Sequence, residues 1–202
     1  MSTEITSALI GLGGAVVGGL LSSFVPWWKE AREREQILER HGRYSAIRVL
    51  AVLEEYAEKC TEVVSDDGTC EGRPAGRMES GEEYYEVQVA TPASPRFPDD
   101  VDWQSIGAKS GDLMYRILSL PNAAREADRF IASSSEHASP PGYEEVFAAR
   151  HQGYAFLGAQ AVDLAKKLRV AFDLPDLPAK PWDWGWDAEG FFQDTLNKGK
   201  AK

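Results

Sequence analysis

The chain has 202 residues, of which 43% are hydrophobic and 27% are charged, and its net charge is −10. This length leaves enough residues for one domain with a real core. The acidic balance excludes nucleic acid as the expected partner, because binding there is driven by Lys and Arg side chains that meet phosphates.

Residues 5–28 are the first feature of the chain, because none of them carries a charged side chain. A helix rises about 1.5 Å per residue, so about 20 apolar residues cross the roughly 30 Å hydrocarbon core of a bilayer. We therefore predict a transmembrane helix over 5–28, with residues 1–4 as a short outside terminus. Trp27, Trp28 and Lys29 are predicted to anchor it at the membrane interface.

Three other interpretations of this run fit the residues less well. A cleaved signal peptide needs a basic start and small residues at its cleavage site, whereas residues 1–4 hold no Lys or Arg and the run ends in bulky side chains. A dinucleotide-binding turn would need a third glycine where Val16 stands. A buried hairpin of a soluble protein stays open, because the glycines make the run only moderately hydrophobic.

The basic residues beside the run predict its orientation, because Lys and Arg are enriched on the cytoplasmic side of membrane helices. They all follow the run: Lys29, Arg32, Arg34, Arg40 and Arg43. We expect the N-terminus outside and the C-terminal part in the cytoplasm. Two cysteines, Cys60 and Cys70, without a disulfide framework suit a reducing compartment, and a bacterial inner membrane is the expected location.

Small residues recur along the predicted membrane helix in two neighbouring rows. One row is Ser7, Gly11, Ala15, Gly19 and Ser23, and the other is Gly14, Gly18 and Ser22. On a helix these rows merge into one smooth face. Helices in lipid associate by close backbone approach, so this face predicts a homo-oligomer or docking on another membrane helix.

Residues 29–64 are predicted to form one long helix, with 29–43 as a charged stalk. Its second half carries apolar or small residues at the spacing of a helix that packs against other helices. They are Ala46, Leu50, Leu53, Ala57, Cys60 and Val64, with Ile47 and Tyr56 widening the stripe. Gly42 is a weak point between stalk and stripe, and the turn residues 65–68 should end the helix.

Residues 65–108 are expected to be a long irregular loop within a bundle domain over 44–175. Residues 65–82 hold little to bury, and the acidity of Asp66 and Asp67 is interpreted as ordinary loop acidity, because neither opens a calcium-binding loop. Residues 84–89 alternate like a strand but have no clear partner, so we expect an extended segment. Prolines then hold the chain extended.

The helical period returns after Trp103 and predicts three further helices. Ser110 or Asp112 caps the first, and Pro121 is placed as the first residue of the second. The second helix carries Phe130 on its apolar face. The third, over about 142–173, is the natural antiparallel partner of the 44–64 helix. The expected fold is mostly α, with a membrane helix followed by an antiparallel helical bundle.

The tail over 176–202 is rich in proline and aromatic residues and ends in a short predicted helix. Its aromatic residues are Trp182, Trp184, Trp186, Phe191 and Phe192. So dense a patch must be buried somewhere, either by folding back on the bundle or by docking on a protein partner.

No catalytic, cofactor-binding or metal-binding constellation stands out along the chain. His41, His137 and His151 lie far apart in polar stretches and are interpreted as surface residues. We therefore expect no cofactor, no metal and no enzyme activity, although helical periodicity does not report sites. An enzyme whose site the sequence does not reveal is the third hypothesis for the function.

The leading hypothesis is a single-pass adaptor or scaffold that self-associates in the membrane lipid and presents its bundle to cytoplasmic protein partners. The alternative is a membrane-acting effector whose glycine-rich helix oligomerises into a lesion or pore. That alternative ranks second, because the run has no polar stripe beyond Ser and Thr to line a water path.

Overall fold

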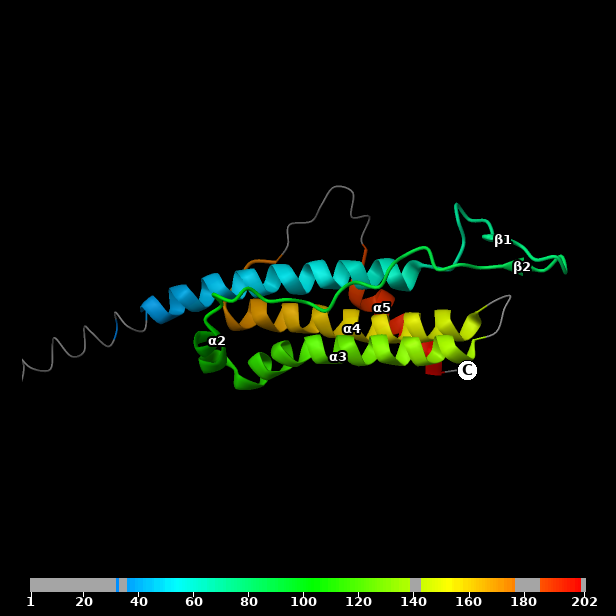
Figure 1. The fold of residues 1–202 in the computed structure, drawn as a ribbon. Coiled ribbons are helices and arrows are strands. Elements are labelled where there is room, and N and C mark those ends of the chain that lie inside the picture. Colours follow the sequence, from blue (N-terminus) through cyan, green and yellow to red (C-terminus); the bar gives the residue numbers. More distant parts are fainter. Residues whose placement is uncertain (1–31, 33–35, 139–142, 177–185, 201–202) are drawn as a thin grey trace, which may run out of the picture. The chain divides into compact units, whose positions relative to one another are not determined.

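The computed structural model describes residue 32 and residues 36–138, 143–176 and 186–200, and it is mostly helical (Figure 1). The chain divides into two compact units, residues 1–41 and residues 42–202. In the first unit, the described residues 36–41 are helical and exposed. Everything below concerns the second unit.

The first helix continues from the preceding unit and runs to residue 65, where the turn residues were expected to end it. Its buried stripe is the one that the spacing predicts: Ala46, Leu50, Leu53, Ala57, Cys60 and Val64. Tyr56 is buried with them, but Ile47 is 50% exposed, so the stripe is narrower than predicted on that side.

Gly42 is not a weak point in this helix but a close contact. A Cβ atom at this position would lie 3.0 Å from the Phe172 ring and 3.0 Å from Cβ of Ser105. Packing of the bundle therefore begins at Gly42, where only a residue without a side chain lets the helix approach its neighbours so closely.

A small β-hairpin follows the first helix where an irregular loop was expected. Strand β1 (Gly76–Arg77) pairs with β2 (Glu83–Tyr84) in antiparallel register, with Gly76 opposite Tyr84. Of the strand-like segment 84–89, only Tyr84 is paired, with Gly76 of the glycine-containing stretch, whereas residues 85–89 belong to no strand.

Residues 86–102, which we call the strap, then run extended along the bundle (Figure 1). One end is tied beside Asp66, which accepts hydrogen bonds from the backbone of the strap. The other end is tied to the first helix, since the amide of Asp102 donates to Ser45 Oγ at 3.0 Å and Arg48 pairs with Asp100. The strap thus returns the chain to the starting end of the first helix.

The strap is long enough for this return because an extended chain covers more distance per residue than a helix. Residues 45–66 span about 32 Å as a helix. The residues between Val89 and Asp102 can reach about 43 Å when fully extended. The strap therefore returns with slack, and the next helices start at the same end as the first.

Helix α2 (Trp103–Lys109) and helix α3 (Gly111–His137) follow, separated only by Ser110. Asp102 caps α2 by accepting from the amide of Ser105 at 3.1 Å, and Ser110 caps α3 by accepting from the amide of Leu113 at 3.3 Å. Each cap satisfies a backbone donor that has no partner within its helix.

Pro121 lies inside α3 instead of beginning a new helix, so the predicted boundary is wrong. A proline in a helix interior removes one backbone hydrogen bond and costs about 3 kcal/mol. The helix continues because Ile117, Leu120 and Ala124 are all buried on the two sides of the proline. Their burial offsets the lost hydrogen bond and the strain, which local propensity alone cannot show.

Helix α4 (Glu144–Ala171) is the central element of the bundle and runs antiparallel to α3. Arg116 pairs with Asp163 at 2.7 Å, and the Tyr154 hydroxyl donates to Asp128 at 2.6 Å, so later residues of α3 meet earlier residues of α4. The bundle core along α4 includes Tyr154, Leu157, Ala161, Leu164 and Leu168.

The first helix also runs antiparallel to α4, as its predicted partnership requires. Arg169 pairs with Glu54, whereas Arg150 pairs with Asp66. It follows that the first helix and α3 run parallel to each other, so the bundle is not antiparallel throughout. The strap is the crossover that makes this arrangement reachable.

Helix α5 (Ala188–Lys200) packs on α4 through the ring of Phe192, which is fully buried. A Cβ atom at Gly158 of α4 would lie 2.2 Å from Cζ of that ring. Gly158 therefore forms the seat of Phe192, and the described part of the tail folds back on the bundle.

None of the helices in the described part of the chain is long and apolar enough to cross a membrane. The predicted membrane helix over 5–28 and the terminus over 1–4 lie outside the described residues.

Candidate functional site

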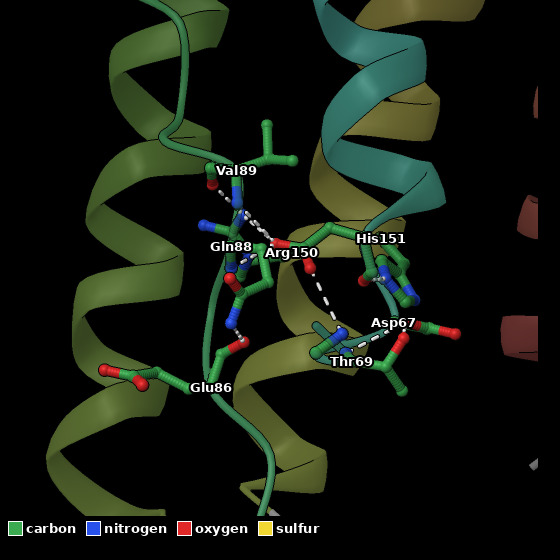
Figure 2. Close-up of polar contacts among 9 residues, drawn as sticks. Asp67, Thr69, Glu86, Gln88, Val89, Arg150 and His151 are labelled. Carbon is green, nitrogen blue, oxygen red and sulfur yellow. Dashed lines mark hydrogen bonds and ion pairs between the residues drawn. The ribbon is translucent and has the colours of Figure 1, made fainter. Parts of the chain in front are cut away.

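The carboxylate of Asp66, just after the first helix, accepts four hydrogen bonds. Its partners Gln88, Val89 and Arg150 are labelled in Figure 2. The Oδ1 atom of Asp66 accepts from the amide of Gly68 at 3.1 Å. Its Oδ2 accepts from the amides of Gln88 at 3.1 Å and Val89 at 3.0 Å, and from the Arg150 guanidinium at 3.2 Å. One carboxylate therefore joins the end of the first helix, the strap and α4.

Arg150 completes this cluster from α4 by donating to the carbonyl of Val89 at 2.6 Å. His151 lies beside it, and its Nε2 is 2.7 Å from the carbonyl oxygen of Asp66. The side chains of Arg150 and Asp66 are 5% and 1% exposed, so a substrate cannot reach the pair. We conclude that this cluster holds the strap in place and is not a catalytic site. We call its side chains, those of Asp66, Arg150 and His151, the clamp.

The clamp corrects two predictions from the sequence. Asp66 is not ordinary loop acidity, because its carboxylate is buried and fully used. His151 is not a surface residue, since it is half-buried and bonded to the backbone. Asp67 is the exposed loop acid that was expected, and hydrogen bonds from the hydroxyl and amide of Thr69 hold its pKa below the usual range.

A second polar group, buried apart from its half-buried Asp128, lies between the first helix, α3 and α4. It contains Tyr56, Cys60, Tyr154 and Asp128, whose carboxylate accepts from Tyr154. Burial raises the pKa of Cys60 to about 12 and raises the pKa values of both tyrosines above their ordinary value. A thiol that stays protonated is a poor nucleophile, so this group adds polar packing and no reactive cysteine.

The feature best suited to meeting another molecule is a groove of about 810 Å³ formed by α3, α4 and α5. Small residues on two helices contribute to its lining: Ala123, Ala127, Gly153 and Ala159. Phe130 of α3 is 55% exposed and Phe156 of α4 is 50% exposed, so two large rings border it in contact with solvent. Leu196 contributes from α5.

Two carboxylates line the groove: that of Asp163, which is paired with basic side chains, and that of Glu126. Asp163 lies 2.7 Å from Arg116 and 2.8 Å from Lys167. Desolvation opposes the shift, but hydrogen bonds from Lys167 and Arg116 hold the pKa of Asp163 below its usual range. Glu126 of α3 is exposed in the same groove. The groove thus combines an apolar surface with two acidic side chains, of which Asp163 is paired with basic residues.

The sequence-predicted site residues are distributed between the described and the remaining parts of the chain. The association residues between Ser7 and Ser23, the anchor Trp27 to Lys29, and Trp182 and Trp184 lie outside the described residues.

The described aromatic residues of the tail differ in their exposure. Phe192 belongs to the core, and Phe191 is half-buried with its centroid 5.6 Å from that of Phe192. Trp186 stays 53% exposed, with its centroid 4.9 Å from that of Phe191. Trp186 is therefore the described ring of the tail that is most open to a partner.

In the part of the chain that the structure describes, no three or more His, Cys, Asp or Glu side chains are grouped so that they could hold a metal ion. Comparison of the chain with protein-family models, curated proteins and solved structures finds no match. Function therefore has to be argued from the surface of the bundle itself.

The groove was not predicted, although one of its residues was singled out. Phe130 was placed on the apolar face of its helix, and periodicity does not distinguish a ring in the core from a ring at the edge of a groove. The signal in the sequence that could have indicated a groove was the presence of small residues near Phe130, because Ala and Gly leave room beside a large ring.

Proposed function

We propose that the protein is a membrane-anchored adaptor, not an enzyme, and that its bundle binds a helix of a partner protein in the groove between α3, α4 and α5. The observation that carries the proposal is the pair of half-exposed rings, Phe130 and Phe156, over small residues. Exposed apolar surface of this kind, edged by polar groups, is typical of an interaction site. A groove between helices suits the apolar face of an amphipathic helix.

The charge of the protein favours a basic partner helix. The whole chain carries a net charge of −10, and Glu126 exposes a carboxylate in the groove, whereas Asp163 is already paired with Arg116 and Lys167. Complementary charge raises the association rate and disfavours acidic competitors. The expected occupant therefore has apolar residues toward Phe130 and Phe156, with Lys or Arg along its flanks.

The test uses the full chain in maltoside micelles and two labelled helical peptides of about 15 residues, one built from Leu and Lys and one from Leu and Glu. Fluorescence anisotropy should show saturable binding of the basic peptide and weaker binding of the acidic one. Phe130→Asp and Phe156→Asp should each weaken binding at least about tenfold, since central aromatic anchors carry most of the energy of such interfaces.

The matched control is Ile47→Asp, which places the same charge at a half-exposed apolar position of the first helix, away from the groove. It should leave the affinity unchanged. If all three variants bind the basic peptide as tightly as the unaltered protein, the groove is not the docking site.

The membrane anchor and self-association are the second half of the proposal. The uncharged run over 5–28, its small-residue face and the basic residues after it support an anchor with the bundle in the cytoplasm. Native mass analysis in mild detergent should find a defined oligomer, and the double variant Gly14→Leu, Gly18→Leu should be monomeric. A monomeric unaltered protein would leave the run as an anchor without an assembly role.

A further inference from the structure

Two adjoining hollows lie between the β-hairpin and the start of α4, away from the groove. The first has a volume of about 470 Å³ and the second about 720 Å³. Both are lined by Tyr84 of β2 and by Tyr143, which precedes α4. These two rings are common to both hollows, which we treat together as the hairpin pocket.

The first hollow of the hairpin pocket is rich in aromatic residues. It is lined by Tyr84 and Tyr85 from the hairpin side and by Tyr143 and Phe147 from the α4 side. Four rings from two separate segments thus surround one space of a size that suits a small molecule.

Glycines fix two of these rings in place. The Phe147 ring lies over Gly68, where a Cβ atom would be 2.5 Å from Cζ of the ring. The Tyr84 ring lies across Gly76 of β1, where a Cβ atom would be 2.6 Å from its Cε1. These rings are therefore held by close packing against backbone, which is the preorganisation that a binding site requires.

Tyr143 occupies a strained backbone conformation at the edge of the pocket. Its φ and ψ are 48° and 33°, in the left-handed region, and it caps α4 without a side-chain hydrogen bond. This conformation is unfavourable for a residue with a side chain, because Cβ comes too close to the following carbonyl oxygen. Gly or Asn would adopt this conformation with less strain than Tyr. The strained position nevertheless holds a large ring at the pocket. Strained residues of this kind cluster at ligand sites.

The charges around the hairpin pocket are negative. Glu86 lines the first hollow and Glu79 lines the second. The cation in the lining, Arg77, is paired with Glu83 at 2.9 Å. A positively charged ligand would therefore meet both aromatic faces and carboxylates, whereas an anion would meet neither a free cation of this lining nor a favourable potential.

We propose that the hairpin pocket binds a small quaternary ammonium compound. The faces of aromatic rings carry negative potential and attract a cation within about 6 Å of the ring centroid. A quaternary ammonium group has no N–H donor to satisfy, which suits a hollow that four aromatic residues help to line.

The test is isothermal titration calorimetry of the full chain in maltoside micelles with choline as the probe. The control ligand is 3,3-dimethylbutan-1-ol, which has the same shape but no charge. Choline should bind saturably at one site, and the neutral isostere should bind at least about tenfold more weakly, since the cation–π attraction depends on the charge.

Variants then assign the binding to the rings. Tyr143→Leu and Tyr84→Leu should each weaken choline binding at least about fivefold, while Tyr143→Phe should retain it, because the ring face and not the hydroxyl makes the contact. Tyr115→Leu removes a tyrosine of α3 that is 70% exposed and should change nothing. Circular dichroism of each variant verifies that it is folded.

The proposal is overturned if choline gives no saturable heat with the folded protein, or if the neutral isostere binds as tightly as choline. It is equally overturned if both leucine variants are folded and bind choline unchanged. Failure of the groove peptides would not affect this result, because the groove and the hairpin pocket share no lining residue.

Discussion

Replacing Asp66 should release the strap from the bundle while leaving the helices in place. In Asp66→Ala, the amides of Gly68, Gln88 and Val89 and the guanidinium of Arg150 all lose an acceptor. The Arg150 side chain is 5% exposed and would keep its charge with only the Val89 carbonyl as acceptor.

The magnitude follows from two estimates. Removing one partner of a buried ion pair costs about 3–5 kcal/mol. Each buried donor left without an acceptor adds about 1–3 kcal/mol unless water reaches it. Water can reach the amides of the strap once it moves, because Gln88 is already exposed, so we expect a total loss of about 4 kcal/mol in the free energy of unfolding. That is a large share of the roughly 5–15 kcal/mol that stabilises a typical protein.

The assay is urea unfolding of the full chain in maltoside, followed by circular dichroism, together with hydrogen exchange of the peptide that covers residues 86–102. Asp66→Ala should lower the unfolding midpoint and make the strap exchange faster than α4. The matched control is Asp67→Asn, at the neighbouring exposed aspartate, which should leave both quantities unchanged. Equal midpoints for the two variants, or full protection of the strap in Asp66→Ala, would refute the role assigned to the clamp.

Two further predictions concern the core. Gly158→Ala should destabilise the docking of α5 by about 1–3 kcal/mol, because the new methyl group meets the Phe192 ring, and limited proteolysis should then release α5. Burial raises the pKa of Cys60 to about 12 from its ordinary 9.0, so at pH 8 a thiol reagent should modify Cys70 alone until the protein is unfolded. The protonated thiol is favoured in the folded state, so this contribution to stability is complete below about pH 8.5 and is lost as the pH rises toward 12.

Matched control variants test the physical reason behind each of these two predictions. Gly153→Ala adds the same methyl group to α4 where the nearest atom lies at 3.5 Å, so it should be neutral or stabilising, since Ala exceeds Gly in helix propensity by about 1 kcal/mol. Similar losses from both glycine variants would contradict the packing argument. Rapid labelling of Cys60 in the folded protein would contradict its burial, and Cys60→Ala should remove its part of the alkaline loss.

Where one face of a helix is buried along its whole length, the sequence predicts the structure well. The stripe from Ala46 to Val64 on the first helix is buried as its spacing indicates, and α4 has bounds close to those expected. Such patterns are local, because residues three and four apart share a face whatever the rest of the chain does.

Predictions that depended on tertiary contacts failed, because contacts between distant parts of the chain leave no local pattern in the sequence. Pro121 is a good first residue of a helix by local preference, but burial of its neighbours keeps it inside α3. Asp66 and Asp67 are the same residue type in adjacent positions, and only the return of the strap makes one a buried anchor and leaves the other in solvent. No spacing within the loop distinguishes them.

The two candidate sites are even harder to predict from a sequence pattern, because each combines residues that are distant in the chain. The groove needs Phe130 and Phe156 from two different helices, and the hairpin pocket needs rings on both sides of a long separation in the chain. The groove depends on the antiparallel contact of α3 with α4, and the hairpin pocket depends on a hairpin whose first strand has only two residues.

The clamp also determines when the bundle can close during synthesis of the chain. Asp66 and Arg150 are 84 positions apart, so at about 5–20 residues per second the carboxylate leaves the ribosome about 4–17 s before its guanidinium partner exists. During that interval the first helix has neither α4 to cover its apolar stripe nor a fixed strap beside it. The nascent chain therefore exposes the apolar stripe of the first helix for seconds, and the bundle closes only after α4 emerges.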